Sequence, residues 1–287
     1  MNYKNQSSLV DCEWLTNRLK LPNVKLVDAS WYLPDTGRNA RAEYRAERIP
    51  GAMFLDIELV SDPAAPHPHT VVEPMIFSDE VTALGIERSD HVVIYDGMGL
   101  FSAPRVWWMF KIYGYDKVSV LNGGFPKWKA EGRQIETNQP EMPVPTVPFE
   151  VGFRPKMMRI LPQMVENVKT GQEHVLDARG PGRFQGTDPE PREGVRSGHI
   201  PGSANMPYAA LMDPDTGLIK DADALAALYA EAGVRDDKGV VCSCGSGITA
   251  CALAFGLHLL GRDDVAVYDG SWSEWGSQPD TPVETGP

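Results

Sequence analysis

The strongest constraint on the fold is an internal repeat. Four short segments of the first half recur in the second half in the same order, about 147 to 151 residues later. The matched pairs are VKLVDAS (24–30) with HVLDARG (174–180), RIPGAMFLDI (48–57) with HIPGSANMPY (199–208), HVVIYDG (91–97) with KGVVCSCG (238–245), and VLNGGFPKW (120–128) with VYDGSWSEW (267–275). Four ordered matches at one spacing indicate the duplication of a whole domain, so the sequence predicts two homologous domains.

Each domain is expected to have an α/β fold. Several of the repeated segments are short apolar runs that end in turn residues, a pattern typical of buried strands. Helical patterns alternate with them: DADALAALYAEAG (221–233) begins with acidic capping residues and ends on a glycine. Strands that alternate with helices favour a mainly parallel sheet flanked by helices. The predicted fold class is therefore two such α/β domains in tandem.

Prolines mark the junction between the two halves. The stretch QPEMPVPTVPFEVGF (139–153) is rich in proline, which favours a semi-extended chain that crosses the surface. We predict a first domain over residues 1–138, a linker over 139–158 and a second domain over 159–287.

The charge and the lack of long apolar runs limit the partners and the compartment. The 287 residues carry a formal net charge of −12, which argues against nucleic acid as the main partner. No run approaches about 18 apolar residues, so no membrane span is expected. The N-terminal MNYKNQSSLVDCEWL lacks the regions of a secretory signal, and four cysteines are too few for a disulfide framework. We therefore expect a cytoplasmic protein.

The turn within VVCSCGSGITACALAFGLHLLG (240–261) is the best candidate for a reactive site. The pattern predicts a strand, a glycine-rich turn and a helix. Parallel sheets bind ligands beyond the carboxyl ends of their strands, where Cys244 stands. Loop N–H groups and the helix N-terminus can converge there on an anion and favour a thiolate. We predict Cys244 as the nucleophile, in a site formed by Gly245, Gly247, Ile248 and Thr249.

Other roles for the cysteines fit less well. Zinc sites commonly use two C-x₂-C pairs and thioredoxin-like redox sites use C-x-x-C, whereas this chain has one C-x-C. A Cys-x₅-Arg phosphatase loop would need an arginine where Ala250 stands. Cys242 on the strand and Cys251 in the helix are predicted to be buried structural thiols. We therefore predict no metal site.

The repeat also assigns different roles to the two domains. Alignment of the strand ends places Asp96 opposite Cys244, so only the second domain has a thiol at this turn. The first domain is expected to lack a nucleophile and to serve as a support, such as one wall of the cleft.

Together these features resemble a known family. Two rhodanese-like domains with the degenerate one first, and CGSGIT (244–249) after a strand, are similar to the 3-mercaptopyruvate sulfurtransferases, tandem-domain members of the rhodanese family. The IPG motifs, DARGPGRFQGTDPEPREGVRSGHIPGSANMP (177–207) and YDGSWSEWG (268–276) extend the resemblance over nearly the whole chain.

The resemblance implies roles for the nucleophile and for two arginines. Cys244 would take a sulfur atom and become a persulfide. Arg183 and Arg192 would bind the carboxylate of the substrate, to which planar guanidinium groups are suited. Arg179 lies closer to the strand and is expected to form a structural salt bridge.

The resemblance also implies that an acid, a histidine and a hydroxyl act together. These positions match Glu58, His69 and Ser246, although many members of the family have aspartate where this chain has Glu58. His67 stands two residues before His69 in the same loop. The three groups would polarise the substrate or transfer a proton.

The loop also bears on the sulfur donor. Thiosulfate-specific relatives carry cationic residues in this loop, as in C-R-K-G, where this chain has the neutral Gly245 and Ser246, so a monoanionic mercapto-acid fits better. The resemblance implies transfer of sulfur from 3-mercaptopyruvate to cyanide or to a thiol acceptor, such as thioredoxin or a small dithiol. Pyruvate and hydrogen sulfide would be released, and no cofactor is required. The alternatives are a thiosulfate:cyanide sulfurtransferase and a persulfide carrier without turnover.

Overall fold

The first half of the chain forms one sheet and its helices. The strands are β1 (Leu9–Val10), β2 (Val24–Asp28), β3 (Met53–Phe54), β4 (His91–Tyr95) and β5 (Val118–Leu121). The helices are α1 (Cys12–Thr16), α2 (Ala40–Ala46), α3 (Pro74–Ala83), α4 (Ala103–Ile112) and α5 (Gly124–Ala130), with 3-10 turns η1 (Gln6–Ser8) and η2 (Pro34–Thr36).

The second half repeats this arrangement. Its strands are β6 (Met158–Arg159), β7 (Glu173–Asp177), β8 (Ala204–Asn205), β9 (Gly239–Ser243) and β10 (Val265–Tyr268). The helices are α6 (Leu161–Thr170), α7 (Pro181–Gln185), α8 (Ala222–Glu231), α9 (Ala250–Leu259) and α10 (Ser271–Trp275), with 3-10 turns η3 (Pro155–Met157) and η4 (Tyr208–Leu211).

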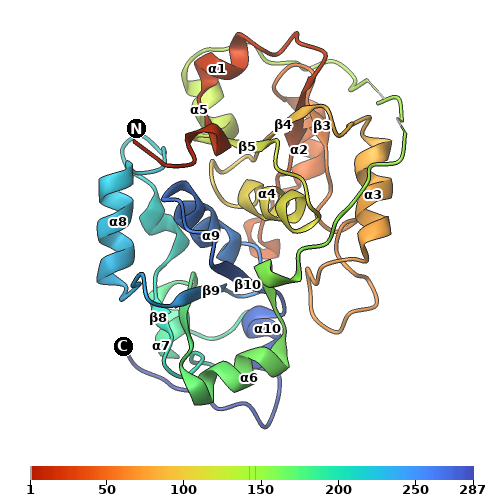
Figure 1. The fold of residues 1–287 in the computed structure, drawn as a ribbon. Helices are drawn as coiled ribbons and strands as arrows, with labels where there is room; N and C mark the ends of the chain where they lie inside the picture. Colours follow the sequence, from red (N-terminus) through yellow and green to blue (C-terminus); the bar gives the residue numbers. More distant parts are fainter. Residues whose placement is uncertain (1, 142, 146) are drawn as a thin grey trace.

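The two sheets have the same topology. The computed structural model describes residues 2–141, 143–145 and 147–287, and within them it contains two five-stranded parallel sheets flanked by helices (Figure 1). The order is β1-β5-β4-β2-β3 in the first sheet and β6-β10-β9-β7-β8 in the second, so each strand has a counterpart at the same place. The prediction of two homologous α/β domains is confirmed.

Two buried helices join the domains. Nine of the ten residues are buried in both α4 and α9, and most of those residues are apolar. The two helices pack against each other between the sheets (Figure 1). Trp107 of α4 meets Phe255 of α9 edge to face, with ring centroids 4.9 Å apart. The domains therefore share one continuous hydrophobic core.

The N-terminal segment also crosses onto the second domain. The N–H groups of Lys4 and Asn5 donate to the carbonyl of Leu259, and Ser8 Oγ lies 2.9 Å from His258 Nε2. Burial lowers the pKa of His258 to about 4, so this ring is neutral at pH 7.

The segment between the sheets packs on the first domain before it enters the second. Phe149 is buried there, and the N–H of Gly152 donates to the carbonyl of Tyr113. β6 then begins at Met158 and pairs with β10. Met142 and Thr146 of the predicted linker lie outside the described residues, and the domain boundaries at 138 and 159 stay a prediction.

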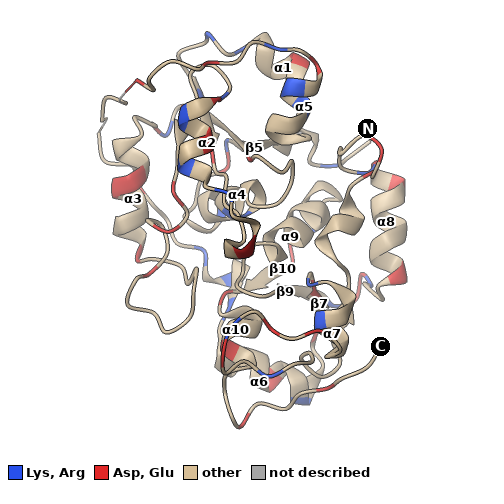
Figure 2. Cartoon of the chain, turned by 180° about the vertical axis from the view of Figure 1, so that it is seen from behind, with Lys and Arg blue, Asp and Glu red and all other residues tan. Residues whose placement is uncertain are grey.

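Acidic charge is prominent on the outer helices. Figure 2 shows that α3 and α8 carry acidic residues and no basic ones, in keeping with the net charge of −12. Such a surface disfavours polyanions. In the described part of the chain, no helix is both long and apolar enough to span a bilayer.

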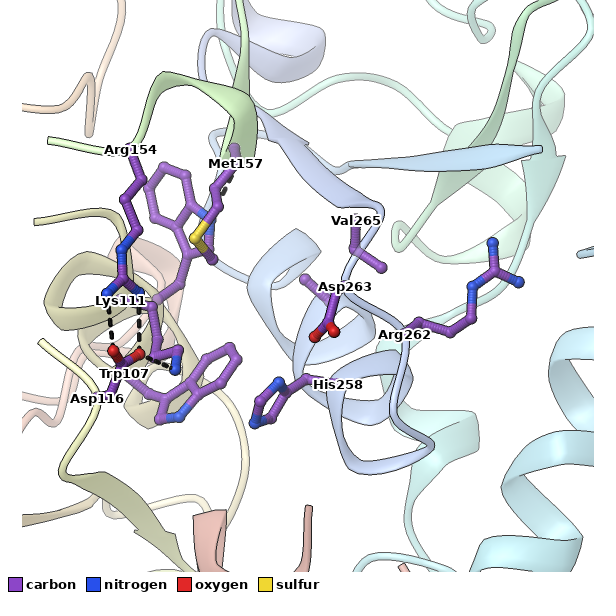
Figure 3. Close-up of a pocket in the computed structure, with 11 residues that line it drawn as sticks. Trp107, Lys111, Asp116, Arg154, Met157, His258, Arg262, Asp263 and Val265 are labelled. Atoms are coloured by element: carbon purple, nitrogen blue, oxygen red, sulfur yellow. Dashed lines mark hydrogen bonds and ion pairs between the residues drawn. The ribbon is translucent and has the colours of Figure 1, made fainter. Parts of the chain in front are cut away.

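A cavity of about 230 Å³ lies between the domains at the C-terminal ends of α4 and α9 (Figure 3). Trp107, Met157 and His258 form part of its wall. Asp116 beside it accepts hydrogen bonds from Arg154 at 2.7 and 2.9 Å. None of the predicted site residues lines this cavity, which lies at the opposite end of α9 from Cys244.

The turn after β4 shows what such a loop binds. Asp96 follows β4 as Cys244 follows β9, as predicted from the repeat. Its buried carboxylate accepts hydrogen bonds of 2.6 to 2.8 Å from five backbone N–H groups of its own loop; the donors are Met98, Gly99, Phe101, Ser102 and Ala103. The loop of the first domain is therefore an anion cradle that the chain itself fills.

The cradle predicts a large effect of Asp96→Asn on stability. Asparagine has one acceptor oxygen in place of two, so several buried N–H groups lose their partner, each at a cost of about 1–3 kcal/mol. We expect the free energy of unfolding in urea to fall by at least about 3 kcal/mol. Asp221→Asn is the control, because asparagine caps α8 as well as aspartate does. Equal stability of the two variants would show that the cradle does not hold Asp96 as described.

Candidate active site

Cys244 is the first residue after β9, at the carboxyl end of the sheet. Its backbone is held on both sides: its N–H donates to Ser271 Oγ at 3.3 Å, and its carbonyl accepts from the N–H of Trp272 at 2.9 Å. The side chain is 2% exposed, and the N–H of Gly247 donates to Sγ at 3.1 Å. The thiol therefore faces the inside of the loop, where backbone dipoles favour negative charge.

Gly247 is required by the geometry of this loop, and Gly245 is closely approached by a side chain. Gly247 has φ of +81°, a conformation that other residues rarely adopt. A Cβ at Gly245 would lie 3.1 Å from Arg183 Nη2. Ile248 is buried, and Thr249 precedes the first residue of α9. The structure thus brings all four predicted loop residues around Cys244, while their contact with a substrate stays a prediction.

Ser246, His69 and Glu58 form a chain of contacts across the domain junction. His69 Nδ1 lies 2.8 Å from Ser246 Oγ, and His69 Nε2 lies 3.3 Å from Glu58 Oε1. Because a carboxylate only accepts hydrogen bonds, His69 Nε2 carries a hydrogen and donates it to Glu58. His69 Nδ1 then accepts the hydrogen bond of the Ser246 hydroxyl. The structure therefore brings Ser246 of the second domain to His69 and Glu58 of the first, 177 residues away from His69 in sequence.

A tryptophan that sequence reasoning missed completes this group. Trp31 Nε1 donates to Glu58 Oε1 at 2.8 Å, and its ring meets His69 edge to face at 4.7 Å. The hydrogen bond from His69 lowers the pKa of Glu58, and that from Trp31 acts in the same direction. A deprotonated Glu58 can accept both bonds. The available signal for Trp31 was its place, directly after the repeated segment 24–30 and beyond the carboxyl end of β2.

Backbone strain is concentrated at the same place. His69 (φ +62°) and Ser271 (φ +49°) are the two non-glycine residues with positive φ among those that the structure describes. Such conformations persist where surrounding contacts enforce them, and they cluster at functional sites. His67, the alternative histidine, accepts at its carbonyl the hydrogen bond of the Thr70 hydroxyl and has no contact with Ser246.

The two predicted substrate arginines lie near the loop, but only one of them, Arg183, has an ion-pair partner. Arg183 of α7 donates to Glu190 at 2.5 and 3.2 Å while its Nη2 faces Gly245. Arg192 is half-buried; its carbonyl accepts from the N–H of Val195, but its guanidinium has no hydrogen bond or ion pair with any described residue. Burial and the charge of Arg183 lower the pKa of Arg192. A bound anion would stabilise such a guanidinium, which is partly desolvated, has no ion-pair partner and lies near a second cation.

Arg179, Cys242 and Cys251 are buried structural residues, as predicted. Arg179 is buried and pairs with Asp177 and Glu190, both at 2.7 Å. Burial raises the pKa of Cys242 far above its ordinary value and that of Cys251 to about 12, so both are neutral thiols inside the core.

Comparison with known proteins agrees with this architecture. The model of the rhodanese-like domain matches residues 11–131 and again residues 161–278. The 3-mercaptopyruvate sulfurtransferase of Rattus norvegicus is 42% identical, over 97% of this chain and 96% of its own length. The thiosulfate sulfurtransferase of Cricetulus griseus is also 42% identical, over the same shares of the two chains.

A solved structure supports the same relationship. SseA from Escherichia coli, described among 3-mercaptopyruvate sulfotransferases, superposes with a TM-score of 0.83 and 34% identity, and the match covers 92% of this chain and 98% of that one. With both halves matched and sequence relatives aligned along nearly its whole length, this chain belongs to the rhodanese family and has two rhodanese-like domains in tandem.

Proposed function

We propose that this protein is a sulfurtransferase that moves the sulfur of 3-mercaptopyruvate to a thiol acceptor through a persulfide on Cys244. The observation that carries the proposal is that two groups lie near each other. One is the Cys244 thiol, inside a loop of backbone N–H groups, and the other is the guanidinium of Arg192, which has no ion-pair partner. A nucleophile and a carboxylate-binding group are both needed for a mercapto-acid donor. The names of the relatives above include this activity.

In the first step the Cys244 thiolate attacks the sulfur of the donor. A sulfur–sulfur bond forms and the carbon–sulfur bond breaks, with its electron pair leaving on carbon as the enolate of pyruvate. The proton of the donor thiol must then reach that carbon. The net reaction converts one thiolate and one mercaptopyruvate into one persulfide anion and one pyruvate, so atoms and charge balance.

Arg192 and Arg183 hold the donor in place. Guanidinium groups bind carboxylates through two parallel hydrogen bonds. Glu190 fixes the orientation of Arg183, whose second face remains directed to the loop, and Arg192 is free to pair with the substrate. The bound carboxylate would then stand beside the loop with the donor sulfur directed at Cys244.

Ser246, His69 and Glu58 transfer the proton. Ser246 is the second residue after Cys244, and its hydroxyl is hydrogen-bonded to His69, which Glu58 orients. A hydroxyl hydrogen-bonded to an imidazole that a carboxylate orients is the arrangement used for proton transfer in other enzymes. It would polarise the carbonyl of the donor and deliver the proton to the enolate carbon.

The second half of the reaction regenerates the thiolate. The outer sulfur of the persulfide would lie among the loop N–H groups, which stabilise its charge as Asp96 is stabilised in the first domain. A thiol attacks this sulfur and takes it away from Cys244; with a dithiol such as thioredoxin, the second thiol then releases it as hydrogen sulfide and a disulfide forms. A cytoplasmic location stays a prediction.

The loop favours the mercapto-acid over thiosulfate. Thiosulfate carries two negative charges in a small volume, and the side chains that follow Cys244 are neutral up to the start of α9. The thiosulfate sulfurtransferase among the relatives makes this the second candidate function. A carrier without turnover is the third; the chain of contacts from Ser246 to Glu58 favours turnover over it.

A comparison of donors tests the proposed function. We expect kcat/KM for 3-mercaptopyruvate, measured as pyruvate formed with dithiothreitol as acceptor, to exceed that for thiosulfate with cyanide by at least about 100-fold, since Glu190 already pairs with Arg183 and leaves only Arg192 to offset the two charges of thiosulfate. Cys244→Ser should abolish both activities. A higher value for thiosulfate would establish the second candidate, and absence of turnover with either donor would establish the carrier.

Removal of a guanidinium tests the carboxylate site. Arg192→Ala should raise KM for 3-mercaptopyruvate by about tenfold or more, as expected for a charge-assisted hydrogen bond, and should lower kcat less. Arg183→Ala should act in the same way. Arg235, which pairs with Asp237 on the surface, provides the control Arg235→Ala. If KM is unchanged in both site variants, the substrate carboxylate binds elsewhere.

A further inference from the structure

Arg105 is a fully buried cation at the junction of the two domains. It projects from α4 of the first domain, is 0% exposed, and lies over the ring of Trp108 with 4.8 Å to the centroid. A buried charge is strongly unfavourable unless it is paired and hydrogen-bonded. The hydrogen-bond and ion-pair partners of Arg105 therefore indicate which parts of the structure its guanidinium holds together.

Those partners belong to both domains and to the active site. Arg105 Nη2 donates to the carbonyl of His69 and lies 3.2 Å from Asp269 Oδ1. Arg105 Nη1 donates to the carbonyl of Gly247, in the loop of Cys244, at 3.3 Å. One guanidinium thus contacts the backbone of the histidine and the backbone of the nucleophile loop.

Asp269 extends the connection. It follows β10 of the second domain, and its Oδ2 accepts from the N–H of Val71 at 2.9 Å. The chain from 69 to 71 is therefore held at His69 by Arg105 and at Val71 by Asp269. His69 has a left-handed backbone, which an ordinary loop would not maintain without such contacts.

We propose that Arg105, together with Asp269, is a positioning residue for sulfur transfer: it fixes the His69 backbone of the first domain against the Cys244 loop of the second, so that His69 meets Ser246. The guanidinium touches neither the donor nor the reacting sulfur. Its effect passes through His69, and it should therefore appear in kcat far more than in KM, because the arginines that bind the carboxylate are separate residues.

The planar fork of arginine is essential to this role. Three acceptors from different segments surround it, namely the carbonyls of His69 and Gly247 and the carboxylate of Asp269. An ammonium group on a flexible chain keeps the charge for Asp269 but cannot hold all three acceptors in one plane. Arg105→Lys therefore retains the positive charge but removes the planar group that donates to the three acceptors.

The test is a double-mutant cycle in kcat for pyruvate formation from 3-mercaptopyruvate. We expect Arg105→Lys to lower kcat by about 10- to 100-fold with KM within about threefold of wild type, a loss typical of a misplaced catalytic group. In a His69→Ala background the same change should cost less than about threefold, because residues that act as a unit are not additive. The control is Arg48→Lys, another buried arginine of the first domain, which contacts Asn138 and Glu136; it should leave kcat unchanged.

Asp269→Asn gives the same test if Arg105→Lys does not fold, since it preserves size and removes the charge; we expect about a tenfold loss of kcat that again disappears without His69. The positioning role is wrong if a folded variant keeps wild-type kcat, or if its loss is the same with and without His69. The inference rests on the sulfur transfer proposed above. A wild-type protein that forms no pyruvate would refute that function, whereas an active wild type with independent effects would refute only the role of Arg105.

Discussion

The packing of α4 against α9 is the contact on which the rest of the structure depends. It merges two cores into one and places the N-terminus of α9, with its nucleophile loop, against the first domain. His69 can reach Ser246 only because of this arrangement, and Arg105 and Asp269 then set the alignment from within the junction. The proposed site is therefore composite: the second domain supplies the thiol and the first supplies the histidine. The first domain has Asp96 in place of a thiol, and under the proposed function it forms half of the active site.

The duplicated loops show how one backbone serves two purposes. In the first domain the converging N–H groups bind the Asp96 carboxylate, and the loop is a closed structural unit. In the second domain the equivalent position is Cys244, a smaller side chain that receives one N–H bond, from Gly247. The capacity of such a loop for negative charge is then available to a sulfur atom added to the thiol. The equivalent turns of the two domains thus hold different side chains, a carboxylate in the first and a thiol in the second.

Elements built from local pattern could be predicted from the sequence, whereas contacts across the junction could not. The segment 221–233 became α8 because its first residue, Asp221, accepts from the N–H of Ala224 and its two buried residues, Leu225 and Tyr229, are four positions apart on one side of the helix. The repeat likewise gave the place of Cys244. Arg105 meets Gly247 across 142 residues of sequence, and Trp31 meets Glu58 from another loop. No periodicity encodes such contacts, since they follow from how the two domains pack. His69 and Glu58 were predicted only through resemblance, for the same reason.

The central claim is that Cys244 carries sulfur covalently during turnover, and the mass of the protein tests it most directly. The protein is incubated with 3-mercaptopyruvate in the absence of an acceptor, digested under non-reducing conditions and analysed by mass spectrometry. The peptide that contains Cys244 should gain the mass of one sulfur atom and should lose it again when dithiothreitol is added. No gain in mass while pyruvate accumulates, or a gain that fragmentation of the peptide places on Cys242 or Cys251, would contradict the account.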